Sequence, residues 1–136
     1  MTYFFAKTLD VPFDDAIFKV TEALAAKGFG ILTTIDVKAT MKKKLDADMA
    51  PYTILGACNP PLAHQALQAE PDIGLLLPCN VIVREEAAGR VVVGFLDPQT
   101  MVGLVGKPSV RPVADAAEER LRRACAALGG SGPASV

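Results

Sequence analysis

Apolar residues recur at helical spacing in two long segments of the chain. The first segment runs from Pro12 to Gly28, and one face of a helix there would carry Phe13, Ile17, Val20 and Leu24. The second starts near Val113 and stops at Gly129, and the same spacing connects Ala117, Leu121, Ala124 and Leu128. Such a stripe is typical of a helix that turns one face toward a core. The pattern therefore predicts two long amphipathic helices.

Runs rich in β-branched and aromatic residues precede and separate these helices. They predict strands at residues 3–9, 29–37, 52–58, 73–84 and 90–96. Pro78 interrupts the fourth run, and residues 85–90, which include Gly89, are typical of a hairpin turn. Residues 97–112 contain several glycines and prolines, so we expect them to be irregular.

Two shorter helices are expected between the strands. Residues 38–45 carry a cluster of lysines and are typical of a short basic helix. Residues 60–69 begin with a proline at the first helical position, and Asn59 before it is a good N-cap. The order β-α-β-β-β-β-α, with these two additions, predicts an α+β fold. In that fold, a curved antiparallel sheet carries the two long helices on one face.

Length and composition agree with a single domain. The chain has 136 residues, and we expect one domain over residues 1–129 and a flexible tail over residues 130–136. Hydrophobic residues make up 51% of the chain and Trp is absent, so the core is expected to be aliphatic. The apolar excess also indicates a surface for a second copy, which predicts a homodimer.

Charge and hydropathy argue against two classes of partner. The 14 basic and 15 acidic residues nearly cancel, whereas nucleic-acid binders usually carry a basic excess. The longest strongly apolar run, residues 73–77, is too short to insert across a membrane. The first residues lack the features of a secretory signal, so we expect a cytoplasmic protein with reduced cysteines at positions Cys58, Cys79 and Cys125.

Three stretches of the chain resemble one known family. They are residues 28–32 with Ile35-Asp36, residues 52–60 (Tyr-Thr-Ile-Leu-Gly-Ala-Cys-Asn-Pro) and residues 74–81 (Gly-Leu-Leu-Leu-Pro-Cys-Asn-Val). In this order they resemble the bacterial and archaeal family called domain of unknown function 302. The resemblance implies a TATA-binding-protein-like architecture, a curved antiparallel sheet with two helices on one side. It implies no activity, and a shared fold does not confer DNA binding.

The candidate site centres on two Cys-Asn dipeptides. Cys58-Asn59 and Cys79-Asn80 each lie at the end or kink of a predicted strand, and His64 follows on the next helix. Two thiols and an imidazole are ligands that a soft metal prefers, but their spacing matches no standard metal motif. Alternatively, Cys58 or Cys79 is a reactive thiol with His64 as its base. In the third interpretation the cysteines are small hydrophobic residues of the core.

Two asparagines and two lysines complete the candidate ligand-binding residues. Asn59 and Asn80 either fix the local backbone or orient a ligand at the rim of a pocket. The backbone N–H groups that begin the 60–69 helix are expected to suit a carboxylate or phosphate. Lys38 and Lys42 share one helical face and would attract an anionic metabolite, unless that face is simply solvated.

The function that the sequence favours is that of a non-catalytic module. Such a module binds a small molecule, forms a homodimer, or does both. One alternative is a thiol-dependent enzyme or redox protein that uses Cys58 or Cys79, and another is a protein that binds a soft metal. The residues identify no cofactor.

Overall fold

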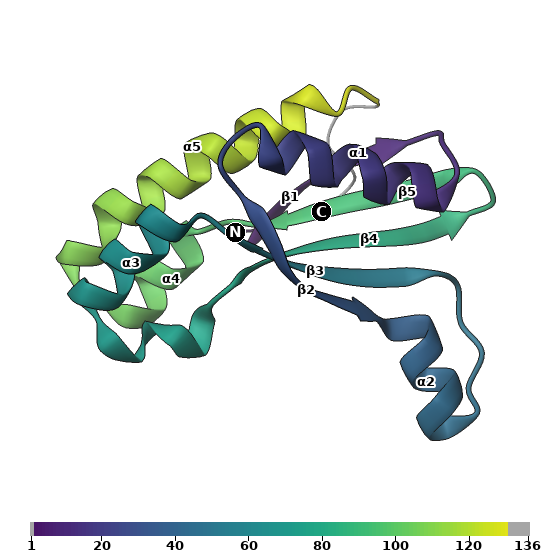
Figure 1. Cartoon of the computed structure of the whole chain (residues 1–136), viewed down its shortest axis with the longest axis horizontal. Helices are drawn as coiled ribbons and strands as arrows, with labels where there is room; N and C mark the ends of the chain where they lie inside the picture. Colours follow the sequence, from purple (N-terminus) through teal and green to yellow (C-terminus); the bar gives the residue numbers. More distant parts are fainter. Residues whose placement is uncertain (1, 131–136) are drawn as a thin grey trace.

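A five-stranded antiparallel sheet organises the protein, whose computed structural model describes residues 2–130 (Figure 1). The strands are β1 (Phe4–Leu9), β2 (Gly30–Asp36), β3 (Tyr52–Cys58), β4 (Cys79–Ala87) and β5 (Arg90–Leu96). The α-helices are α1 (Phe13–Ala25), α2 (Val37–Leu45), α3 (Pro60–Ala69), α4 (Gln99–Val105) and α5 (Arg111–Ala127). Two 3₁₀ helices complete the chain, η1 (Pro71–Leu76) and η2 (Pro108–Val110). The predicted α+β class and the order of its strands and long helices are confirmed.

The strands lie in the order β1-β5-β4-β3-β2, and each pairs antiparallel with its neighbours. Strands β1 and β2 are consecutive in the chain yet form the two opposite edges, so α1 carries the chain across the sheet between them. Helix α1 contacts β2, β4 and β5, while α5 packs against α1 and β1. Both long helices therefore cover the same face of the sheet (Figure 1).

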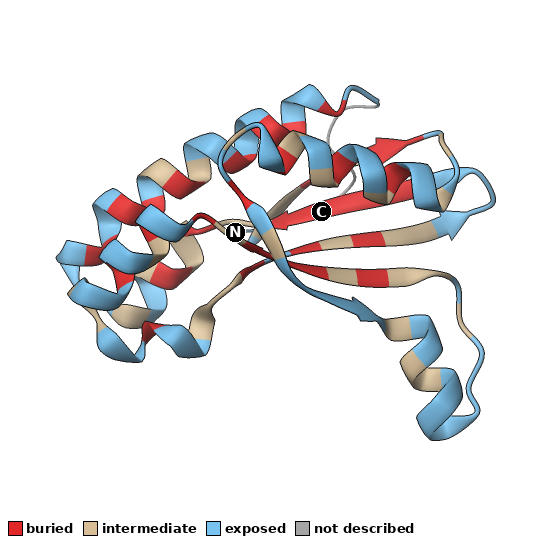
Figure 2. Ribbon diagram, viewed as in Figure 1, coloured by how far each residue is buried: buried red, intermediate tan, exposed pale blue. Residues whose placement is uncertain are grey.

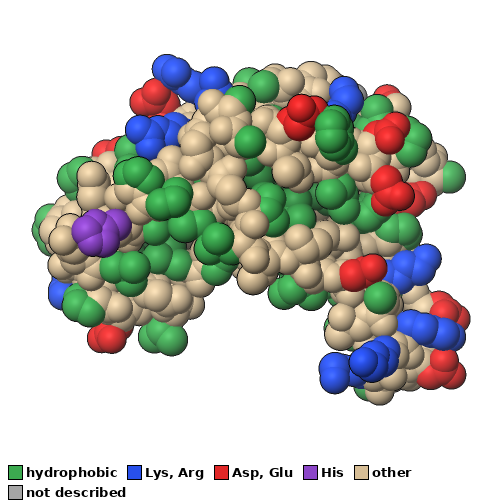
Figure 3. All heavy atoms as spheres, viewed as in Figure 1, with side chains coloured by type: hydrophobic (Ala, Val, Ile, Leu, Met, Phe, Trp, Pro, Cys, Tyr) green, Lys and Arg blue, Asp and Glu red, His purple; other side chains and the backbone are tan. Residues whose placement is uncertain are grey.

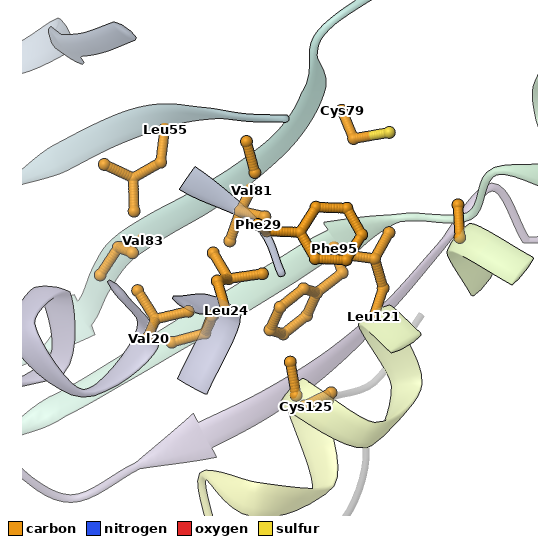
Figure 4. Packing of buried hydrophobic residues seen from close by; sticks show 14 of the residues in the cluster. Val20, Leu24, Phe29, Leu55, Cys79, Val81, Val83, Phe95, Leu121 and Cys125 are labelled. Atoms are coloured by element: carbon orange, nitrogen blue, oxygen red, sulfur yellow. The ribbon is translucent and has the colours of Figure 1, made fainter. Parts of the chain in front are cut away.

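The core fills the space between this face and the two long helices (Figure 4). Val20 and Leu24 from α1 and Leu121 from α5 are completely buried. The opposing side chains of the sheet are Leu55, Val81, Val83, Val91, Val93 and Phe95. The core is mostly aliphatic, as predicted, but Phe29 and Phe95 are aromatic members of it. The burial pattern also shows that α2 contributes no buried residue (Figure 2).

The strand predicted at residues 73–84 is wrong at its beginning. Residues Pro71–Leu76 form η1, and β4 starts only at Cys79. The Glu70 carboxylate accepts a hydrogen bond from the backbone N–H of Asp72 (3.2 Å) and so caps this turn. The apolar run there is not a buried strand, since Ile73 is buried while Leu75 is 89% exposed.

The segment predicted to be irregular, residues 97–112, contains α4 and η2, and α5 begins at Arg111. Gly106 ends α4 in the left-handed region, with φ of 72°. The hairpin is also tighter than predicted, because β4 continues to Ala87 and β5 starts at Arg90. The predicted 130–136 tail lies, apart from Gly130, outside the described residues.

A polar network fastens α4 to α5. The side-chain amide of Gln99 donates to the carboxylates of Asp115 (2.6 Å) and Glu118 (3.0 Å). Arg122 pairs with Glu118 at 2.7 Å, and its guanidinium lies 4.2 Å from the ring centre of Phe5. Arg122, and to a lesser extent Gln99, hold the pKa of the Glu118 carboxyl below its usual range. These contacts hold together α4 and α5, the two helices that contribute Met101, Val113 and Ala117 to the pocket described below.

None of the described helices is long and apolar enough to cross a membrane.

Candidate functional site

An apolar pocket of about 300 Å³ lies between α3, η1 and the start of β4. Met101 from α4 and Val113 and Ala117 from α5 also line it. Of the described residues that form its lining, Asn59 is the one with an amide side chain, Cys58 and Cys79 contribute thiols, and none is charged. Because water gains few hydrogen bonds on such a surface, the pocket suits an apolar group.

Asn59 fixes the wall that α3 contributes. Its side-chain oxygen accepts a hydrogen bond from the backbone N–H of Leu62 (3.3 Å), and its backbone oxygen accepts from Ala63 (2.8 Å). Asn59 is only 7% exposed, so the cap is buried at the pocket. The predicted capping role of Asn59 is confirmed.

The anion site predicted at the start of this helix does not fit the local chemistry. Pro60 and Pro61 occupy the first turn and have no N–H groups to donate. The next two N–H groups, of Leu62 and Ala63, are already bonded to Asn59. A carboxylate or phosphate would therefore find no free backbone donor in the first turn.

The two thiols meet at the pocket because β3 and β4 are neighbours. Cys58 ends β3 and Cys79 begins β4, and Ala57 pairs directly with Cys79. Cys79 is 8% exposed, and this burial, with a smaller effect of the nearby Cys58, raises the pKa of its thiol to about 11. Cys79 is therefore a neutral thiol at neutral pH and a poor nucleophile.

Two leucines that the sequence reasoning missed reach the pocket from its exposed side. Leu32 is 66% exposed and Leu67 is 41% exposed, and both line the pocket. Leu32 lies at the irregularity in β2 between Ile31 and Thr33, where the pairing register with β3 shifts. Figure 3 shows hydrophobic side chains gathered on this part of the surface, near the histidine. The periodic patterns of apolar residues in the sequence did not single out either leucine as a pocket residue.

His64 and the other predicted residues do not share the pocket. His64 is exposed on α3, Asn80 is exposed on β4, and neither lines the pocket. Lys38 and Lys42 lie on α2, from which no residue reaches the pocket. Lys42 instead pairs with two carboxylates, those of Asp46 (2.8 Å) and Asp48 (3.2 Å). The fold thus brings together Cys58, Asn59 and Cys79, and separates the rest.

The separation of His64 from the thiols bears on two alternatives, the soft-metal site and the reactive thiol with His64 as its base. Within residues 2–130, no three His, Cys, Asp or Glu side chains are grouped so that they could hold a metal ion. A base for a thiol nucleophile would have to lie within hydrogen-bond reach, and the exposed imidazole does not line the pocket. The third cysteine, Cys125, is buried in the core on α5, and its burial raises the pKa of its thiol.

A second hollow, of about 750 Å³, lies beside β1 and α4. Its lining includes the exposed side chains of Tyr3, Leu104 and Arg111, together with Asp97 and Gln99. Asp97 and Gln99 already hydrogen-bond within the network that joins α4 to α5. The smaller pocket instead reaches core residues such as Phe29 and Ala57, and for that reason it is the better candidate site.

The thiols are expected to react in a defined order with iodoacetamide. At neutral pH, Cys58 should be alkylated first, because it is partly exposed while Cys79 and Cys125 are buried and have raised pKa values. Mass spectrometry of digested protein at successive times measures the order. Unfolding in urea is the control and should make all three react at similar rates. Faster labelling of Cys79 in the folded protein would contradict the description of the pocket.

Comparison with known proteins identifies relatives without a described activity. An uncharacterized protein of Aquifex aeolicus (strain VF5) is 26% identical over 92 residues, which are 68% of this chain and 58% of that protein. The chain therefore matches somewhat over half the length of that relative. The crystal structure of an uncharacterized conserved DUF302 protein from Bacillus stearothermophilus has a TM-score of 0.87 at 26% identity. That match covers 95% of this chain and 100% of the other.

The family comparison agrees with the resemblance seen in the three stretches of sequence. The model of the family described as domain of unknown function DUF302 matches residues 5–128, from β1 to the end of α5. Because that match spans nearly the whole chain, the protein belongs to the DUF302 family.

Proposed function

We propose that the protein is a non-catalytic module that binds a small apolar molecule, or the apolar tail of a larger one, in the pocket beside α3. The observation that carries the proposal is the pocket's lining, which is apolar except for Asn59 and two thiols. Apolar pockets with few polar groups are typical ligand sites, and about 300 Å³ is at the small end of their range.

The exposed leucines support this proposal. Leu32 and Leu67 leave apolar surface in water at the pocket, and a bound apolar group would remove part of it from solvent. Each Å² of apolar surface that is buried contributes roughly 25 cal/mol. Asn59 carries the one amide side chain among the described lining residues, and that side chain is already held in place by its cap to Leu62.

The thiol-dependent alternative has less support. Cys79 stays protonated at neutral pH because of its burial, and His64 is not placed to act as a base for either pocket thiol. In the binding module the two cysteines are instead small, polarisable walls that contact the ligand.

Filling the pocket is expected to abolish binding. Ala63 is half-buried in the pocket wall on α3, and Ala63→Leu adds apolar volume inside the pocket while keeping a good helix former. With octanol as the probe, titration calorimetry should show binding to the unmodified protein and an affinity at least ~10-fold lower for Ala63→Leu.

Ala126→Leu is the matched control. Ala126 is exposed on α5 and does not line the pocket, so the same change there should leave octanol binding unaltered. Circular dichroism and thermal unfolding check that both variants are folded. Equal octanol affinity in the unmodified protein and in Ala63→Leu, or no measurable binding to the unmodified protein, would sink the proposal.

A further inference from the structure

Basic side chains line a hollow beside the start of α3. The hollow measures about 680 Å³ and lies between the C-terminal end of α1, the first turn of α3 and the middle of α5. Of the described residues in its lining, Lys27, Arg120 and Arg123 are basic, and Glu119 is the one acid. The whole chain, by contrast, has a formal net charge of -1. We call this region the basic hollow.

Two of the three cations have no anionic partner. Arg123 pairs with Glu119 at 3.0 Å on the exposed side of α5. Lys27 is half-buried and Arg120 is exposed, and neither forms an ion pair within residues 2–130. Lys and Arg side chains stand out over α5 at the upper left of Figure 3. Since like charges repel, a bound anion would stabilise this arrangement.

The amide nitrogen of Asn59 adds a hydrogen-bond donor to this hollow. The oxygen of that side chain accepts from Leu62, whereas its nitrogen donates to no acceptor within residues 2–130. No fully buried side-chain nitrogen or oxygen in these residues lacks a partner, so the nitrogen must reach solvent although Asn59 is only 7% exposed. A donor held in a nearly buried side chain is unfavourable unless water or a ligand accepts from it.

Gly28 shows that this nitrogen lies on the side of the basic hollow. A Cβ at position 28 would lie 3.0 Å from the Asn59 nitrogen, and Gly28 lines the basic hollow but not the apolar pocket. Gly28 has φ of 85°, in the left-handed region, and its own N–H already donates to Ala25 (3.0 Å). The donors offered to a ligand here are therefore side chains, and the absence of a side chain at Gly28 leaves the Asn59 amide uncovered.

The chemistry of these groups fits a phosphate group. At neutral pH a phosphate monoester carries a charge of about -1.5 to -2 and has three strong acceptor oxygens. Such an anion can accept from the Asn59 amide and balance the two unpaired cations together. A nucleic acid fits less well, because Asp115, Glu118 and Glu119 lie on the same helix and would repel the neighbouring phosphates.

We propose that the basic hollow binds the phosphate group of a small molecule, with Asn59 donating its amide N–H to a phosphate oxygen and Lys27 and Arg120 balancing the charge. The donors differ from the backbone N–H groups at the start of α3, which the prolines and the cap remove. The proposal does not rest on binding in the apolar pocket, although Asn59 and Leu62 line both cavities.

Titration with inorganic phosphate, followed by two-dimensional proton–nitrogen NMR, tests this site. The side-chain amide signals of Asn59 should shift and saturate, and the backbone N–H signal of Gly28 should shift with the same dissociation constant. Arg120→Gln should raise that constant at least ~3-fold, because it removes one of the two unpaired cations. Glu119→Gln should lower the constant, because it removes the competing carboxylate and releases Arg123.

Two controls separate this site from general attraction of anions. Arg111 is exposed on the same helix and does not line the basic hollow, so Arg111→Gln should leave the dissociation constant unchanged. Sodium chloride at the same ionic strength should leave the Asn59 signals in place. The proposal would be overturned if these signals stayed in place with phosphate, moved equally with chloride, or saturated with the same constant in Arg120→Gln. Unchanged or weaker phosphate binding by Glu119→Gln would also contradict it.

Discussion

Phe95→Ala is expected to lower the free energy of unfolding by about 3–5 kcal/mol, the largest effect of any substitution considered for this protein. Phe95 is completely buried on β5, and its ring stacks on that of Phe5 with the ring centres 5.6 Å apart. Alanine would remove most of the apolar contact and leave a cavity between the sheet and α5. Since small domains have only about 5–15 kcal/mol of stability, this loss would be a large part of the total.

Urea unfolding followed by circular dichroism measures this loss. Phe18→Ala is the matched control, because Phe18 is 64% exposed and the same deletion should change stability by no more than about 0.5 kcal/mol. If the two phenylalanine variants were equally stable, the position of the core between the sheet and the long helices would be incorrect.

Gly56→Ala is expected to lower the free energy of unfolding by about 1–3 kcal/mol, because a methyl group does not fit between β3 and its surroundings. A Cβ at position 56 would lie 2.8 Å from Cγ of Pro78 and still closer to Oγ1 of Thr33. The proline ring is rigid and also lines the pocket, so the substitution would displace the pocket wall as well. Octanol binding should therefore weaken along with stability.

The contact with Thr33 gives this prediction an internal check. Thr33→Ala removes the hydroxyl that an added Cβ would meet, so the double variant should be more stable than Gly56→Ala alone. Gly103→Ala is the control, since a Cβ there meets no atom within 4 Å and the residue lies inside α4. That change should stabilise the protein by up to about 1 kcal/mol. If Gly56→Ala left the free energy of unfolding unchanged, β3 and Pro78 would have to be farther apart than described.

Most of the fold was predictable from the sequence because its long elements carry strong periodic signals. The apolar stripe through Val20 and Leu24 predicted α1, and that through Leu121 and Leu128 predicted α5. The cap at Asn59 predicted the start of α3. These signals are local, so a single sequence reveals them.

The errors occurred where a short apolar run fits more than one structure. Residues Ile73 and Leu75 belong to a run that resembles a buried strand, but η1 exposes Leu75 at its surface. Periodicity cannot separate these cases within a few residues. Helix α4 was missed because Gly103 and Gly106 were taken as signs of a loop, although Gly106 is the residue that ends the helix.

The candidate site was predicted in part. Cys58 and Cys79 were singled out as a pair, and the adjacency of β3 and β4 places both at one pocket. The position of His64 depends on the rotation of α3 about its axis, which the sequence left open and which leaves the imidazole exposed. Leu67, on the same helix, reaches the pocket instead. Sequence spacing alone could not show which of the two side chains turns inward.

A crystal structure of the protein with octanol tests the central claim most directly, since it shows both whether an apolar molecule binds and where. The proposal predicts density for the alkyl chain in the pocket, between α3 and Pro78 and against Cys79, and none there in crystals of Ala63→Leu grown with the same octanol. A pocket that stays free of octanol at saturating concentration, or octanol bound only elsewhere on the molecule, would contradict the proposed function.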